Sequence, residues 1–126
     1  MAIMRFLPAR IAKKYDRLIA GRALYSTPLN EGFLALRELC EADGTLPGNV
    51  IDLCTGTGIA LLEARKVFPE ASLYAVDQSE TMVALAKQKA TEADESNTVF
   101  LTADASALPF SDNHFDAAVI SNAPVF

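Results

Sequence analysis

The stretch from Val50 to Gly58, Val-Ile-Asp-Leu-Cys-Thr-Gly-Thr-Gly, constrains the fold of this chain more than any other. Its apolar start is typical of a buried strand, and that strand contains one acid, Asp52. The two glycines predict a sharp turn, because glycine adopts backbone conformations that other residues avoid and lets a ligand approach the main chain. An apolar helical pattern begins at Ile59, where free N–H groups would face that ligand. This order predicts a nucleotide pocket.

Length and composition limit what surrounds this pocket. A chain of 126 residues with 51% apolar and 21% charged residues predicts one globular domain, or part of one. The net charge of −5 argues against a nucleic-acid partner, since that affinity rests on Lys and Arg. No apolar run approaches the roughly 18 residues that span a bilayer, and no secretory pattern opens the chain. We therefore expect a cytoplasmic protein, with Cys40 and Cys54 reduced.

Helical and strand patterns alternate along most of the chain. The expected elements are a helix with an apolar face from Ile11 to Ile19, a loop over 22–28, a helix over 29–40, a strand over 50–53, a helix over 59–67, a strand over 72–76, a helix capped by Ser79, and strands over 98–102 and 117–120. We divide them into a helical lead-in, residues 1–48, and a cofactor-binding domain, residues 49–126. The alternation predicts an α/β fold with a mostly parallel, Rossmann-like sheet, of which these are the first four strands.

Polar residues follow the strands of this predicted sheet. Asp77 ends the second strand, Asp104 follows the third, and Asn122 follows the fourth. Because ligands of open parallel sheets bind outside the carboxyl ends of the strands, we expect these residues to line one pocket. Asp77 lies about 20 residues after Gly56, the spacing at which an acid meets the ribose hydroxyls of a nucleotide.

Each of these residues also has a structural interpretation. Asp77 could instead cap a helix or a turn. Asp104 could accept a hydrogen bond from an adenine amine, with the N–H of Ala105 donating to a ring nitrogen, or it could bond its own loop. Met82 could pack on an adenine face or belong to the core, and Gln78 has a similarly divided interpretation.

The glycine loop departs from the dinucleotide-binding fingerprint. Gly56-Thr57-Gly58-Ile59-Ala60-Leu61 lacks the third glycine of that pattern. The acid at Asp52 would repel a pyrophosphate, but it would favour a cationic centre such as a sulfonium. A ligand with a cationic centre is therefore favoured, and a nicotinamide-dependent oxidoreductase is the alternative.

Four stretches resemble the class I S-adenosylmethionine-dependent methyltransferases, particularly the small-molecule group that includes the quinone-ring methyltransferases. They are Val-Ile-Asp-Leu-Cys-Thr-Gly-Thr-Gly, Leu-Tyr-Ala-Val-Asp-Gln-Ser with Met82, Ala-Asp-Ala-Ser-Ala-Leu-Pro-Phe, and Asn-His-Phe-Asp-Ala-Ala-Val-Ile-Ser-Asn-Ala. They lie in family order over residues 50–123, and Tyr15-Asp16 resembles the lead-in helix of that group.

The resemblance implies S-adenosylmethionine as cofactor and a small molecule as methyl acceptor. It implies the following cofactor contacts: the methionine part with the loop of Thr55, Gly56, Thr57 and Gly58, the ribose with Asp77, the adenine with Asp104 and Ala105, the transferred methyl near Asn122, and closure of the site by Tyr15. Many members need no catalytic acid or base, because positioning and exclusion of water supply most of the acceleration. We assign none here, and we do not expect His114, the only histidine, to be one. No metal site is expected, because the acids and this histidine lack ligand spacing.

The end of the chain departs from the family, whose members continue past the fourth strand. A chain that ended at Phe126 would leave Ala117 to Ile120 as an apolar sheet edge, a template for pairing with another chain. Three explanations stay open, and we favour the first. The sequence is a fragment of a longer protein, a second copy covers the edge, or the protein is a non-catalytic remnant that binds cofactor without turnover.

Overall fold

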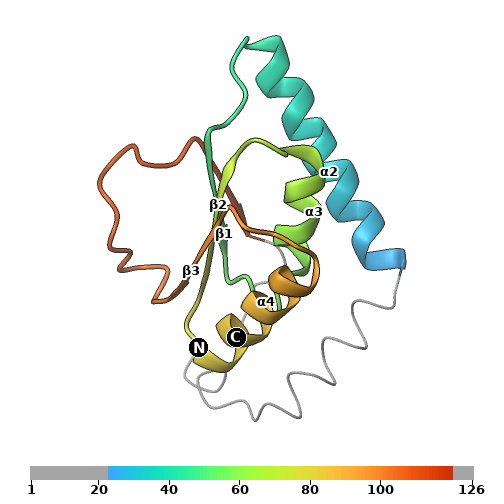
Figure 1. Ribbon diagram of the computed structural model, residues 1–126. Coiled ribbons are helices and arrows are strands. Elements are labelled where there is room, and N and C mark those ends of the chain that lie inside the picture. The colour runs from blue at the N-terminus through green and yellow to red at the C-terminus, as the bar shows by residue number, and fades with distance from the viewer. Residues whose placement is uncertain (1–22, 121–126) are drawn as a thin grey trace.

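The computed structural model describes residues 23–120 and shows a parallel sheet with helices packed against it (Figure 1). The elements are α2 (Ala23–Ala42), β1 (Asn49–Leu53), α3 (Ile59–Val67), β2 (Ser72–Asp77), α4 (Glu80–Glu92), β3 (Thr98–Thr102) and β4 (Ala117–Ile120). The strand order is β3-β2-β1-β4, with every pair parallel. The predicted Rossmann-like α/β sheet is therefore confirmed, and α3, β3 and β4 have their predicted bounds. The predicted helix over Ile11 to Ile19, Tyr15 and Asn122 lie outside the described residues.

The predicted loop over 22–28 is wrong, because α2 already begins at Ala23 and includes Pro28. Proline lacks an N–H group and usually interrupts a helix, which is why the sequence favoured a break there. Packing holds the part of α2 that follows Pro28. Phe33 is buried in the core, and Leu29 and Leu36 pack against it, so the apolar stripe of α2 is held against the rest of the domain. Most helical stability in proteins comes from such packing rather than from local propensity.

The core lies between the sheet and the helices. β1 to β2 and β2 to β3 are crossovers in the same direction, so right-handed connections place α3 and α4 on the same face of the sheet. Val50, Leu73 and Ala75 point from the strands into a cluster with Phe33 and Leu61. Figure 1 shows α2 and α3 on this side, and the segment of residues 103–116, in orange to red, on the other. No helix within residues 23–120 is long and apolar enough to cross a membrane.

The second face of the sheet is covered by aromatic side chains. Tyr74 of β2 makes edge contacts with Phe110, His114 and Phe115, which all belong to the segment that precedes β4. The His114 ring stacks on Phe110, and its Nε2 lies 3.2 Å from the Tyr74 hydroxyl. These contacts hold residues 103–116 against the sheet.

Hydrogen bonds close the amino ends of the strands. Arg65 of α3 donates to both carboxylate oxygens of Glu95, at 2.6 and 2.8 Å, and also to the carbonyl oxygens of Ala71 and Asn97, the residues before β2 and β3. Asp116, just before β4, accepts from the N–H groups of Gly48 and Asn49 at 2.8 and 2.9 Å. One arginine and one aspartate therefore link the starts of all four strands.

Candidate functional site

Strand β1 contains a buried acid, next to the glycine loop, whose hydrogen bonds are incomplete. Asp52 is 3% exposed, and its Oδ2 accepts a hydrogen bond from the Thr55 hydroxyl at 2.7 Å. Its Oδ1 is also buried but has no hydrogen-bond partner among the described residues. Burial raises the pKa of Asp52 to about 7, and the charge of Asp77 adds to the increase, while the Thr55 hydrogen bond opposes it. Asp52 is therefore poised to gain or lose a proton near neutral pH.

The two glycines of this loop differ in what surrounds them. Both have positive φ, +55° at Gly56 and +84° at Gly58. A Cβ on Gly58 would lie only 3.0 Å from the Cβ of Ala86 on α4, whereas a Cβ on Gly56 would meet nothing within 4 Å. Gly58 thus permits close packing of the loop on α4, while Gly56 leaves the main chain accessible. Cys54 also has a positive φ, 56°, which a side chain disfavours.

Asp77 joins three segments at the carboxyl end of the sheet. Its Oδ2 accepts from the N–H of Gly56, and its Oδ1 from the N–H of Ser79, both at 2.9 Å. Its carbonyl oxygen accepts from the N–H of Ala103 after β3, at 3.0 Å. Ser79 caps α4 as predicted, because its hydroxyl accepts from the N–H of Met82. The sequence-based choice for Asp77 lay between a turn residue and a ligand-binding residue, and the structure shows that it bonds the turn.

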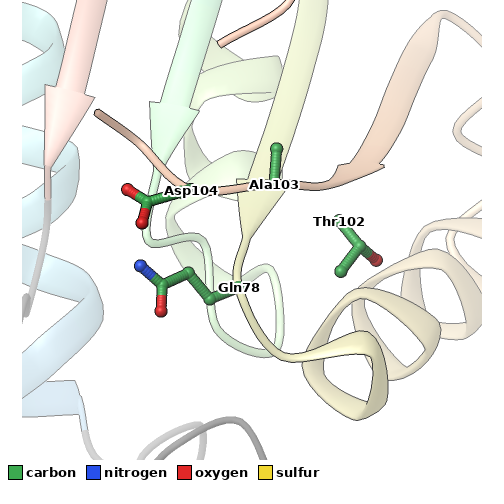
Figure 2. Close-up of a pocket in the computed structure, with 4 residues that line it drawn as sticks. All are labelled: Gln78, Thr102, Ala103 and Asp104. Carbon is green, nitrogen blue, oxygen red and sulfur yellow. The ribbon is translucent and has the colours of Figure 1, made fainter. Parts of the chain in front are cut away.

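A small pocket of about 180 Å³ lies between the ends of β2 and β3. Its lining residues are Gln78, Thr102, Ala103 and Asp104 (Figure 2). In that view the Gln78 amide and the Asp104 carboxylate project to the same side. Asp104 is exposed, and its Oδ1 accepts from the N–H and the hydroxyl of Ser106, at 2.8 and 2.7 Å. This pocket is smaller than the roughly 300 Å³ at which small-molecule sites usually begin.

Thr102 was missed in the sequence. It pairs with Asp77 across β3 and β2, so it lies at the same edge of the sheet as the acids. Its position beside Asp77 follows from the register of β2 and β3. The sequence shows only that Thr102 ends an apolar run. Ala105, in contrast, was predicted, and it lies half-buried beside Asp104.

Other predicted residues support the site from within. Met82 is 1% exposed and Thr57 is 2% exposed, so both side chains belong to the interior. The Thr57 hydroxyl lies 3.4 Å from Nζ of Lys89 on α4. For Met82 the core interpretation is therefore the one that its burial supports, and Thr57 anchors the loop on α4.

His114 lies away from this pocket. Its carbonyl oxygen accepts from the side-chain amide of Asn49, at the start of β1, and its ring is enclosed by the aromatic cluster. The pocket is at the other end of the strands. That His114 is not a catalytic base stays a prediction.

The carboxyl end of the sheet is electronegative. Burial raises the pKa of the Cys54 thiol, and the charges of Asp77, Asp52 and Asp104 raise it further. The charges of three acids therefore produce a negative electrostatic potential at Cys54, in the loop after β1. Such a field favours a ligand with a positive centre and disfavours a pyrophosphate. In the part of the chain that the structure describes, no group of three or more His, Cys, Asp or Glu side chains could hold a metal ion.

Comparison with known proteins defines the family. Residues 50–126, more than half of the chain, match the methyltransferase domain family, and the chain belongs to it. It is 43% identical over 75 residues to a demethylmenaquinone methyltransferase of Thermus thermophilus, which covers 60% of this chain and 34% of that protein. It is also 31% identical over 117 residues to a ubiquinone/menaquinone biosynthesis C-methyltransferase, UbiE, of Ectopseudomonas oleovorans, covering 89% of this chain and 69% of the relative. The chain spans about a third of the length of the first curated relatives that it matches, 31% and 34% for two of them.

Solved structures show the same fold. A SAM-dependent methyltransferase from Aquifex aeolicus matches with a TM-score of 0.55 and 28% identity, over 67% of this chain and 46% of that one. The plantazolicin methyltransferase BpumL in complex with SAH matches with a TM-score of 0.63 over 88% of this chain and 40% of that one. Its 21% identity makes this second likeness one of fold alone.

Proposed function

We propose that the carboxyl end of the sheet binds S-adenosylmethionine and that the protein transfers its methyl group to a small molecule. The observation that carries the proposal is the buried Asp52, whose Oδ1 has no hydrogen-bond partner among the described residues, beside an accessible glycine loop. A buried acid of this kind suits a ligand with a sulfonium and an ammonium group. The titles of two matched structures, a SAM-dependent methyltransferase and a methyltransferase in complex with SAH, name the same cofactor or its product.

The residues present fit this cofactor part by part. Thr55 to Gly58 would hold the methionine part, because the main chain at Gly56 is accessible. Asp77 would hold the ribose, since a carboxylate has about four acceptor sites and two N–H groups use only one on each oxygen. Asp104 with Ala105, and Gln78, would hold the adenine in the pocket between β2 and β3. Met82 and Thr57 would support the site from the interior, and Tyr15 and Asn122 stay predictions.

The bound cofactor supplies a methyl group on a sulfonium, which an acceptor nucleophile can displace in line. The contribution of the chain is to bind and orient the cofactor and to exclude water from it. No described residue is assigned as acid or base. The names of the relatives make a quinone-type ring the first acceptor class to assay. The proposed location of the protein is the cytoplasm.

The open side of β4 is a second element of the proposal. Within residues 23–120, β4 pairs only with β1, and Ile120 at its end is 60% exposed. We propose that further polypeptide pairs with this edge, as a continuation of the chain or as a second copy. Light scattering separates the two, because a stable folded monomer would contradict the second copy.

Calorimetry with S-adenosylhomocysteine and with NADH tests the proposed cofactor. At about 0.1 mM protein, where micromolar binding is readily measured, we expect heat with the first and none with the second. No heat with S-adenosylhomocysteine would contradict the proposal, and binding of NADH would favour an oxidoreductase. Binding without methyl transfer to any quinone-type acceptor would favour a non-catalytic module.

A further inference from the structure

Asp77 connects the glycine loop to the start of α4. The Gly56 N–H donates to one carboxylate oxygen and the Ser79 N–H to the other. Ser79 is fully buried, and Asp77 is only 8% exposed, so this arrangement is shielded from water. The loop makes a second bond to β2, from the Thr55 N–H to the Val76 carbonyl oxygen at 2.9 Å. The glycine loop is thus attached to β2 by two hydrogen bonds, one to the Asp77 side chain and one to the backbone of Val76.

This attachment matters because the conformation that it holds is an unusual one. Gly56 has φ +55° with open space around it, and glycine can leave such a conformation more easily than any other residue. Packing on α4 fixes Gly58, where a Cβ would meet Ala86. No comparable packing fixes Gly56. Besides the backbone bond across this turn, from the Gly58 N–H to the Thr55 carbonyl oxygen, the hydrogen bond to Asp77 is the side-chain contact that holds Gly56 in place.

We infer that Asp77 is a positioning residue that holds the glycine loop ready for the methionine part of the cofactor, in addition to any contact with the ribose. The inference rests on the proposed function for the identity of the ligand. One carboxylate then serves both halves of the cofactor. Its remaining acceptor sites face the ribose hydroxyls, while its bonds to Gly56 and Ser79 join the loop to α4. Removing it weakens binding even where the ligand has no ribose hydroxyl to offer.

The test uses Asp77→Asn with two ligands, S-adenosylhomocysteine and its 2′,3′-dideoxyribose analogue. An amide has one acceptor oxygen, so asparagine can satisfy only one of the two N–H groups. We expect the variant to bind the dideoxy analogue roughly tenfold more weakly than the wild type, since a hydrogen bond to a charged group is lost. Equal affinity of wild type and variant for this analogue would overturn the inference, because Asp77 would then act through the hydroxyls alone. Asp112→Asn, an exposed acid in the segment before β4, is the matched charge control.

Amide hydrogen exchange on the ligand-free protein is a second, independent readout. In the wild type the Gly56 and Ser79 amides should be protected, and in Asp77→Asn at least one of them should lose its protection. The Leu73 amide, which bonds the Asn97 carbonyl oxygen at the other end of β2, should stay protected and show that the variant is folded. Unprotected Gly56 in the wild type would overturn the inference even if the variant failed to fold. If the wild type bound no S-adenosylhomocysteine, the proposed function would fail, while the Gly56 exchange would still decide the positioning role.

Discussion

The two ends of the parallel sheet have opposite characters. At the amino ends, the carboxylates are well supplied with donors: Arg65 lowers the pKa of Glu95, and the N–H groups of Asn49 and Gly48 lower the pKa of Asp116. At the carboxyl ends, Asp52 is buried with one oxygen unpartnered among the described residues, and its pKa is raised to about 7. At the amino ends the carboxylates are hydrogen-bonded and stabilise the fold. At the carboxyl ends one buried carboxylate oxygen has no hydrogen-bond partner among the described residues, and this is the end where we propose that the ligand binds. Strongly perturbed acids in such a location are typical of functional sites.

The largest expected effect tests the amino end. Arg65→Ala should destabilise the protein by about 3–5 kcal/mol, because it leaves Glu95 without its partner and several carbonyl oxygens without a donor. Urea unfolding measures the change. Lys66→Ala is the matched control, since its pair with Glu63 is at the surface and is expected to contribute under about 1 kcal/mol. Similar losses for the two variants would contradict the special role of Arg65.

At the carboxyl end, replacing the buried acid Asp52 should stabilise the protein, in contrast to the loss of stability expected for Arg65→Ala. The pKa of Asp52 is raised from 3.8 to about 7, so the folded state holds a proton that the unfolded state releases, and stability is lost as pH rises from about 4 through 7. Asp52→Asn should therefore be nearly neutral below about pH 4 and increasingly stabilising above it, by on the order of 4 kcal/mol at pH 8. Unfolding at several pH values measures this difference, with Asp112→Asn as the exposed control. An equal effect at all pH values would show that Asp52 does not titrate near neutrality.

At the carboxyl end, the two glycines have different roles: Gly58 permits packing on α4, and Gly56 leaves the main chain accessible. Gly58→Ala should cost about 2–3 kcal/mol, because its Cβ would meet Ala86 and its φ is positive. Gly56→Ala has only the backbone strain and should cost about 1 kcal/mol. Thermal unfolding ranks the two, and calorimetry with S-adenosylhomocysteine should show the larger loss of affinity per unit of lost stability for Gly56→Ala. The reverse ranking in stability would contradict the packing role of Gly58.

The smallest effect concerns Cys54. Replacing it by glycine should stabilise the protein by up to about 1 kcal/mol, since glycine adopts φ 56° without strain, although its greater freedom in the unfolded chain offsets part of the gain. Cys54→Ala keeps the Cβ and should change little. Chemical unfolding of the two variants side by side measures the difference. A destabilised Cys54→Gly would mean that the thiol makes contacts that outweigh the strain.

The regular elements were predicted well from local pattern. The bounds of α3, β3 and β4 and the cap at Ser79 follow from residues that are neighbours along the chain. The start of α2 was not predicted, because Pro28 locally favours a break and α2 nevertheless begins before it, at Ala23.

The site was predicted in outline only. Spacing indicated Asp77, and its position after a strand indicated Asp104. Thr102 lines the pocket because of the strand register, which no single segment shows. Likewise the interior position of Met82 depends on which face of α4 meets the sheet.

The sequence by itself determined the class of fold, the family and the edge of the sheet at which we propose that a ligand binds, because periodicity, glycine turns and strand-end acids are local features. Only the tertiary structure decided which different roles two residues of the same type have. Gly58 packs on α4 while Gly56 stays open, and Asp52 is buried with an unpartnered oxygen while Asp77 bonds two N–H groups. Those differences depend on burial and on partners from distant segments, and they are the ones that determine what each residue contributes.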